Sequence, residues 1–203
     1  MIDILKALIG DFRFIGDIKL DSIGLLDSHN KEVVSEHTVR VAAQSKKLAE
    51  DFGENIEAAE IAGLLHDISG IIPNERRLEF AEALEIDILP EERPYPFILH
   101  QKLSAALAKE LFGITNDSIL SAIGCHTTLK KEAEPLDLIL FVADKLQWDQ
   151  NGNPPYLAEV REGLSKSLKH AAFAFTEYLM NNKADMLMVH PWLVESYEEL
   201  GGI

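Results

Sequence analysis

Ala62-Gly63-Leu64-Leu65-His66-Asp67-Ile68 is the stretch of this chain that says most about its fold. An apolar segment with helical character leads directly into two ionisable residues. Burying such a pair is costly unless protein groups or a metal ion compensate it. We therefore interpret His66 and Asp67 as part of a polar site and expect its other members elsewhere in the chain.

Three further polar residues, His37, His126 and Asp144, occur on otherwise apolar helical faces. Neighbouring residues on a helix point about 100° apart. His66 and Asp67 can therefore share a metal ion only near a helix end or in a groove between helices. If the other three side chains converge there, the site combines imidazole and carboxylate ligands, a set that suits Fe, Mn, Zn or Co.

Apolar periodicity predicts a succession of helices, with Gly53 as a natural stop and Asn151-Gly-Asn-Pro-Pro155 as a strong breaker. Residues 11–27 are irregular, and either a loop or a small strand pair fits them. No stretch alternates as a run of strands would. The fold class predicted is an all-α bundle, with helices over approximately 1–9, 31–52, 57–68, 74–84, 97–112, 117–126, 135–148, 156–182 and 190–201.

The composition narrows the class of partner. The 203 residues include 19 basic and 34 acidic ones, a formal charge of −15, which argues against nucleic acid and anionic membranes as partners. A phosphorylated small molecule remains compatible, because bound metal ions reverse the local sign of a site. The single cysteine, Cys125, excludes an intrachain disulfide, and neither a signal peptide nor a membrane span is indicated. We expect a cytoplasmic protein.

The order His, His-Asp, His, His, Asp on successive helices resembles the HD-domain phosphohydrolase superfamily. The phrases AGLLHDI, FILHQKLSAALAKELFGI, SAIGCHTT and LILFVADKL are similar to the bacterial symmetrical bis(5′-nucleosyl)-tetraphosphatase group. That group cleaves diadenosine tetraphosphate into two ADP and is associated with a di-iron centre. The resemblance covers roughly residues 32–180. We accordingly expect an HD-domain helical bundle over 31–182, an N-terminal extension over 1–30 packed on it, and a C-terminal helical extension over 183–203.

The resemblance also implies how the metal ions are held. His37, His66, Asp67 and Asp144 would hold one ion, and Asp67 would bridge to a second ion held by His100 and His126. The cofactor expected is one or two Fe ions, with Mn, Zn, Co or Mg as alternatives. Asp67 and His66 are the residues expected to be catalytic, and a metal-bound hydroxide would attack phosphorus without a protein nucleophile.

Two departures from the family pattern make the substrate less certain than the ligands. Many HD proteins have a phosphate-binding Lys three residues after the Asp, where this chain has Gly70. The tetraphosphatase group typically has an Arg a few residues after its Ala-Asp pair, and here the stretch from Lys145 to Tyr156 contains no Arg. Lys102, Lys130 or Lys145 could supply the missing cation, and Thr127 could also contact the phosphate.

Three functions therefore stay open. The first is hydrolysis of a nucleotide, above all of a dinucleoside polyphosphate such as diadenosine tetraphosphate. The second is an HD phosphatase for nucleoside monophosphates or other phosphomonoesters, and the third is a non-catalytic sensor of metal or nucleotide. A homodimer is a further prediction, since Phe173, Phe175 and Leu179 could pack internally or form a dimer surface.

The remaining candidates have plainer interpretations. We expect His29, His170 and His190 to have no catalytic role, with His190-Pro191 at the start of a helix. Cys125 lacks a pattern that would activate a nucleophile. Trp148 and Tyr156 could stack on a base or anchor the following helix to the core, and the second interpretation is favoured.

Overall fold

The computed structural model describes residues 3–147 and 152–202. Within these ranges the chain forms α-helices and short 3-10 helices and contains no strand, which confirms the predicted all-α class. The α-helices are α1 Asp3–Ile9, α2 Ile18–Ser28, α3 Glu32–Phe52, α4 Ile56–Leu65, α5 Arg77–Ala83, α6 His100–Phe112, α7 Asp117–Cys125, α8 Pro135–Leu146, α9 Leu157–Leu164, α10 Leu168–Asn181 and α11 Pro191–Leu200. The 3-10 helices are η1 Ile68–Ile71, η2 Asn74–Arg76, η3 Pro96–Leu99 and η4 Lys183–Asp185.

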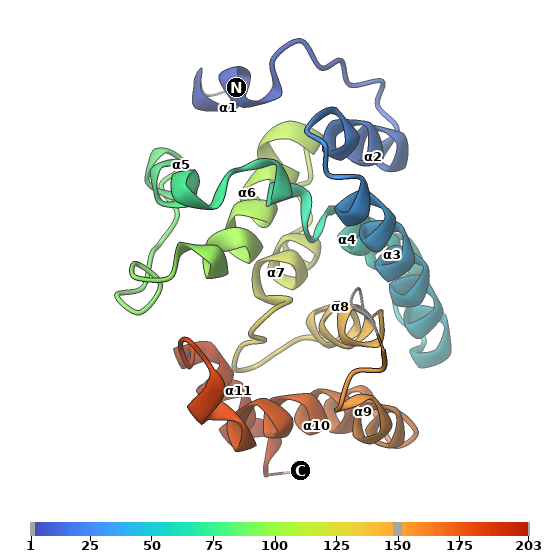
Figure 1. Cartoon of the computed structure of the whole chain (residues 1–203). Coiled ribbons are helices and arrows are strands. Elements are labelled where there is room, and N and C mark those ends of the chain that lie inside the picture. Colours follow the sequence, from blue (N-terminus) through green and yellow to red (C-terminus); the bar gives the residue numbers. More distant parts are fainter. Residues whose placement is uncertain (1–2, 148–151, 203) are drawn as a thin grey trace.

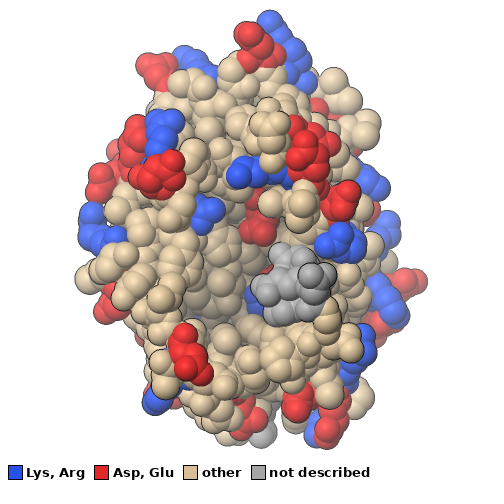
Figure 2. Space-filling model, in the orientation of Figure 1, with Lys and Arg blue, Asp and Glu red and all other residues tan. Residues whose placement is uncertain are grey.

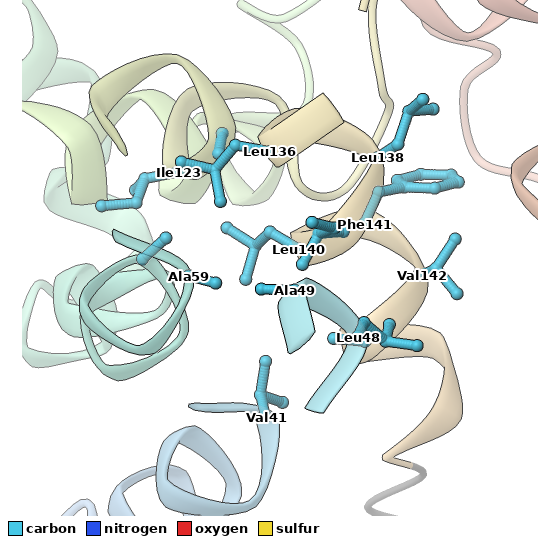
Figure 3. Close-up of a cluster of buried hydrophobic side chains, with 14 of the residues drawn as sticks. Val41, Leu48, Ala49, Ala59, Ile123, Leu136, Leu138, Leu140, Phe141 and Val142 are labelled. Atoms are coloured by element: carbon cyan, nitrogen blue, oxygen red, sulfur yellow. The ribbon is translucent and has the colours of Figure 1, made fainter. Parts of the chain in front are cut away.

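The main core lies between α3, α4, α7 and α8. Val41 and Leu48 of α3, Ile123 of α7, and Leu140 and Phe141 of α8 are almost completely buried in it (Figure 3). Burial of each such side chain contributes roughly 1.5–3 kcal/mol to stability. These four helices carry His37, His66, His126 and Asp144 on or beside them, so the main core fixes the relative positions of the candidate ligands.

A second core joins the N-terminal helices to α5 and α6. Leu5 of α1, Leu25 of α2, Phe80 of α5 and Leu103 of α6 are fully buried together with Ile68 of η1. In Figure 1 this layer occupies the upper part of the molecule, while α9, α10 and α11 lie below α8. The residues between Asp67 and His100 thus belong to a packed layer that holds both ends of that segment near the site.

Close contact between α3 and α4 depends on Gly63. A Cβ added at Gly63 would lie 2.5 Å from Ala42 Cα, which is well inside the distance of real contacts. The absence of a side chain lets the two helices approach closely at this level. His66 follows about one turn later, directly after α4, and His37 lies on α3, so the same close approach brings their two imidazoles together.

The segment 11–27, for which a loop or a strand pair was expected, instead contains helix α2. Asp17 caps it, and its carboxylate accepts a hydrogen bond from Leu20 N at 2.9 Å. Asp21 is buried and accepts hydrogen bonds from the backbone N–H groups of Ile15 and Gly16, both at 2.9 Å. An acidic residue on the inner face of the helix obscured the apolar periodicity.

The prediction of one long helix over 156–182 was wrong. Helix α9 ends at Leu164, and α10 begins at Leu168 after the N-cap Ser167. A Cβ at Gly163 would lie 2.6 Å from the carbonyl oxygen of His170, so α9 turns back closely against α10. A continuous helix could not make this contact.

The apolar residues of α10 are used largely inside the chain. Phe175 packs against Phe141 and Tyr156, with ring centroids 5.6 and 4.6 Å apart, and Phe173 stacks on Tyr197 at 5.7 Å. The homodimer and the boundaries at residues 30 and 182 stay predictions. Among the described residues, none of the helices combines the length and the apolar character needed to cross a membrane.

Candidate metal centre

Three of the histidines are placed by helix ends in the same way. His66 follows α4, His126 follows α7, and His100 is the first residue of α6. In each ring Nδ1 lies 2.8 Å from the carbonyl oxygen three residues earlier, which belongs to Gly63, Ile123 and Phe97 respectively. A carbonyl only accepts hydrogen bonds, so Nδ1 carries the proton in all three rings and Nε2 presents a lone pair. This is the orientation that metal-binding histidines require.

Asp67 lies between two groups of imidazoles. Its Oδ2 is 3.6 Å from His66 Nε2, while its Oδ1 is 3.6 Å from His126 Nε2 and 3.8 Å from His100 Nε2. His37, His66 and Asp67 form one group of atoms close enough to hold a metal ion, and Asp67, His100 and His126 form another. One carboxylate therefore presents an oxygen to each group, as a bridging ligand would.

Asp144 joins the first group from α8. Its Oδ1 is 3.0 Å from His37 Nε2 and 3.6 Å from His66 Nε2. Its Oδ2 accepts a hydrogen bond from Lys145 Nζ at 2.6 Å. The first group thus has two imidazoles and two carboxylates around one point, and a buried ammonium lies beside it.

Several contacts indicate that a cation belongs at this site. His100 Nε2 and His126 Nε2 lie 3.2 Å apart although both Nδ1 atoms already carry the proton, so two lone pairs face each other. His66 Nε2 is buried and has no hydrogen-bond partner among the described residues. A metal ion would resolve both features, because imidazole nitrogen and carboxylate oxygen are ligands for divalent transition metals. The residues present therefore fit such an ion.

The electrostatics agree with this assignment. Burial alone would raise the pKa of Asp67, but His66, His126 and His100 bring that pKa well below its usual range. The pKa of Asp144 is likewise low, because Lys145, His37 and His66 outweigh its burial. Burial would lower the pKa of His66, yet Asp67 and Asp144 raise it overall. The two carboxylates are thus ionised and favour a positive charge between them, whether a proton or a metal ion.

A cavity of about 620 Å³ opens beside these ligands. It is lined on one side by His37, Asp67, His100, His126 and Asp144, and on the other by residues of α10 and of the segment before α9, which include Tyr156, Phe175 and Tyr178. The space-filling view shows a hollow in the middle of this face, with acidic and basic side chains at its edge (Figure 2). The candidate ligands can therefore be reached by a small molecule.

Two of the three expected substrate contacts reach this cavity and one does not. Thr127 lines it with its hydroxyl 2.8 Å from His100 Nε2, and Lys145 lines it from the other side. Lys102 instead donates to Glu92 Oε2 at 2.8 Å and lies over the ring of Trp192, outside this cavity. The buried Glu92 carboxylate holds the ammonium, so Lys102 ties the loop before α6 to α11.

Arg77 is a basic side chain near the site that sequence patterns did not single out. Its Nη1 donates to Phe97 O at 2.6 Å, the same carbonyl that orients His100, and its buried Nε has no partner among the described residues. Burial lowers the pKa of Arg77, although the nearby Asp67 partly restores it. The local sequence signal was a basic residue at the start of α5, the first α-helix after His66-Asp67. Lys130, also considered, forms an ion pair with Asp137 at 3.2 Å.

Other residues have the structural roles expected of them. His190 caps α11 by accepting a hydrogen bond from Trp192 N at 3.1 Å. Cys125 is buried, and burial raises the pKa of its thiol. Tyr156 is 7% exposed and packs on Phe175 while also lining the cavity, so it serves the core and the site together. Trp148 lies outside the described residues.

Comparisons with known proteins are consistent with this site. A family model described as the HD domain matches residues 34–149. A protein of Lactococcus lactis subsp. cremoris, described as lying in the pepC 5′ region, is 47% identical over 142 residues, which are 70% of this chain and 72% of that protein. The symmetrical bis(5′-nucleosyl)-tetraphosphatase of Bacillus subtilis is 28% identical over 168 residues, covering 78% of this chain and 88% of the enzyme.

A solved structure shows the same fold. The crystal structure of a predicted HD superfamily hydrolase involved in NAD metabolism, from Clostridium acetobutylicum, superimposes with a TM-score of 0.83. The sequence identity is 24%, and the match covers 94% of this chain and 99% of the other. The arrangement of helices around the site is therefore one already seen by experiment.

Proposed function

The chain belongs to the HD domain family and is a hydrolase, and from this premise we propose that it is a metal-dependent phosphohydrolase for dinucleoside polyphosphates. Its reaction would be the symmetric cleavage of diadenosine tetraphosphate to two ADP. The observation that carries the proposal is the position of Asp67, which presents one carboxylate oxygen to each of two imidazole groups.

In this proposal the six predicted ligands hold two metal ions. His37, His66 and Asp144 would hold the first ion, His100 and His126 would hold the second, and Asp67 would contribute to both. Two Fe ions are the pair we favour, because the mixed imidazole and carboxylate set suits Fe, and Mn, Zn or Co are the alternatives. When bound, such ions lower the pKa of a coordinated water so that hydroxide forms near neutral pH, and they polarise phosphoryl oxygens.

The chain's own residues position and neutralise the substrate. Lys145 Nζ lies at the cavity wall beside Asp144, where its positive charge offsets charge that develops on the phosphate. The Thr127 hydroxyl, once released from His100 Nε2, can donate to a phosphoryl oxygen. Asp67 and Asp144, both ionised, hold the ligand rings in place. Water adds across the central P–O–P bond, so each half leaves as a nucleoside diphosphate.

The choice of substrate is supported by the relatives and by the shape of the site. The enzyme from Bacillus subtilis is named a symmetrical bis(5′-nucleosyl)-tetraphosphatase, and the match covers most of both chains. A cavity of about 620 Å³ falls within the range of small-molecule sites, roughly 300–1,000 Å³. Aromatic rings at one side and ligands at the other suit a molecule with a base at one end and phosphate at the other.

The test pairs metal analysis with product analysis on one preparation. Protein purified without added metal is analysed for bound metal and then assayed with diadenosine tetraphosphate and with AMP. Two metal equivalents and ADP as sole product support the proposal. One equivalent with phosphate released from AMP would favour the phosphomonoesterase alternative, and bound metal without turnover of either would favour the sensor.

A further inference from the structure

A second cavity adjoins the metal-centre cavity. It has a volume of about 350 Å³, and Thr127, Lys145, Phe175 and Leu179 line both cavities. Thr127 and Lys145 are also the residues nearest to the candidate ligands, through His100 and Asp144. A ligand whose phosphate lies at the metal centre can therefore extend past this shared wall into the second cavity.

The second cavity is lined mainly by apolar side chains. They come from three separate segments, namely η3, α10 and the stretch between η4 and α11, and include Phe97, Phe175, Leu179, Met186 and Met188. Methionine side chains adapt to flat ligands and make favourable contacts with aromatic rings. The lining therefore suits a planar, uncharged group such as a nucleobase and disfavours phosphate.

The polar side chains of this cavity are already engaged within the protein. Thr128 Oγ1 donates to the carbonyl of Leu129 at 2.9 Å. The His190 ring accepts from Trp192 N at 3.1 Å and lies 3.2 Å from Glu92. A base held here would therefore be recognised through its faces and not through hydrogen bonds from these side chains to its edge.

We infer that the second cavity binds one nucleoside of the substrate, with its phosphates directed past Lys145 to the metal centre. The inference rests on the proposed function and extends it, since it places one base and specifies how it is recognised. Apolar contact accepts different bases, so adenine and guanine nucleotides should bind with similar affinity. Most of the nucleoside-dependent affinity should come from the apolar lining.

Binding of ADP and of inorganic pyrophosphate to the metal-loaded protein tests this inference. Isothermal titration of both ligands is compared among the unmodified chain, Met188→Ala and Met180→Ala. Met180 lies on α10 and lines neither cavity, so Met180→Ala is the matched control. Leu187→Asp is a second variant at the rim, where the side chain is 73% exposed and its replacement does not disturb the core.

We expect Met188→Ala to weaken ADP binding about tenfold, as loss of apolar contact predicts, without changing pyrophosphate binding. Met180→Ala should bind both ligands as the unmodified chain does. The affinities of the unmodified chain for ADP and for GDP should differ by no more than about threefold. Unchanged ADP binding in both cavity variants, or equal affinity of the unmodified chain for ADP and pyrophosphate, would overturn the inference. Failure to cleave diadenosine tetraphosphate, with the ADP effects intact, would count against the proposed function alone.

Discussion

Replacement of Asp67 by alanine tests whether one carboxylate serves two metal ions. The side chain is 29% exposed, so its removal should leave the fold intact, and its two oxygens face different imidazole groups. Asp67→Ala therefore removes a ligand from both sites at once. By contrast, His100→Ala removes a ligand from one group only, and His170→Ala alters a histidine that pairs with Ser167 away from the site.

The magnitude follows from the stabilisation that bound metal gives to the folded state. At free metal about 100 times the dissociation constant, each site adds about 2.7 kcal/mol, or about 5.4 kcal/mol for two. For a chain of this size 1 kcal/mol raises Tm by roughly 2–4 °C. Metal should therefore raise the Tm of the unmodified chain by roughly 11–22 °C.

The assay is thermal unfolding in Mn²⁺ and in chelator, together with metal content per chain. His170→Ala should keep the full rise in Tm, His100→Ala about half of it, and Asp67→Ala only a small remainder. If Asp67→Ala kept the full rise and two metal equivalents, the carboxylate would not be a shared ligand. The reasoning from its two oxygens would then be refuted.

Three further predictions concern the surroundings of the site. Lys145→Met removes the ammonium that lies 2.6 Å from Asp144. It should lower kcat by a factor of roughly 10²–10³, as loss of one charge-stabilising donor does, and leave the metal content unchanged. A kcat near that of the unmodified chain would contradict this prediction. Arg77→Ala should raise KM by roughly 10- to 100-fold, because it removes a guanidinium that interacts electrostatically with Asp67 and His100 and can donate to phosphate. Arg77→Lys should recover part of the loss, and equal KM values in steady-state assays would exclude the contact. Gly63→Ala should destabilise the chain by roughly 1–3 kcal/mol in urea unfolding, because its Cβ would lie 2.5 Å from the backbone of α3, whereas Gly124→Ala, with its nearest contact at 3.7 Å, should be neutral or stabilising.

The candidate ligands could be predicted because each is a polar residue in an apolar helical setting. His66-Asp67 marked the site, and the order of His37, His126 and Asp144 along the chain supplied the rest. The structure places His37, Asp67, His126 and Asp144 around one cavity, and the buried His66 lies directly behind Asp67 and Asp144. Periodicity and family resemblance were sufficient to predict that these side chains cluster, because helices carry them at their ends or along one face.

Structural features that depend on contacts between residues distant in the sequence could not be predicted from local patterns. Helix α2 was missed because Asp21 occupies a buried position and binds backbone N–H groups. The break between α9 and α10 depends on how closely Gly163 approaches the backbone of His170. Lys102 was assigned to the substrate because its pairing with Glu92 is set by the path of a loop that sequence patterns do not describe.

The three carbonyl contacts that orient His66, His100 and His126 are each local to one helix end. Each ring is thus aligned by its own segment and does not depend on α10 or on the segment before α9, which form the opposite side of the hollow. Chemistry and choice of substrate are consequently separable in this architecture. Changes in the C-terminal helices can alter which molecule is accepted while the ligand rings keep their alignment, so one scaffold can give rise to enzymes with different substrates.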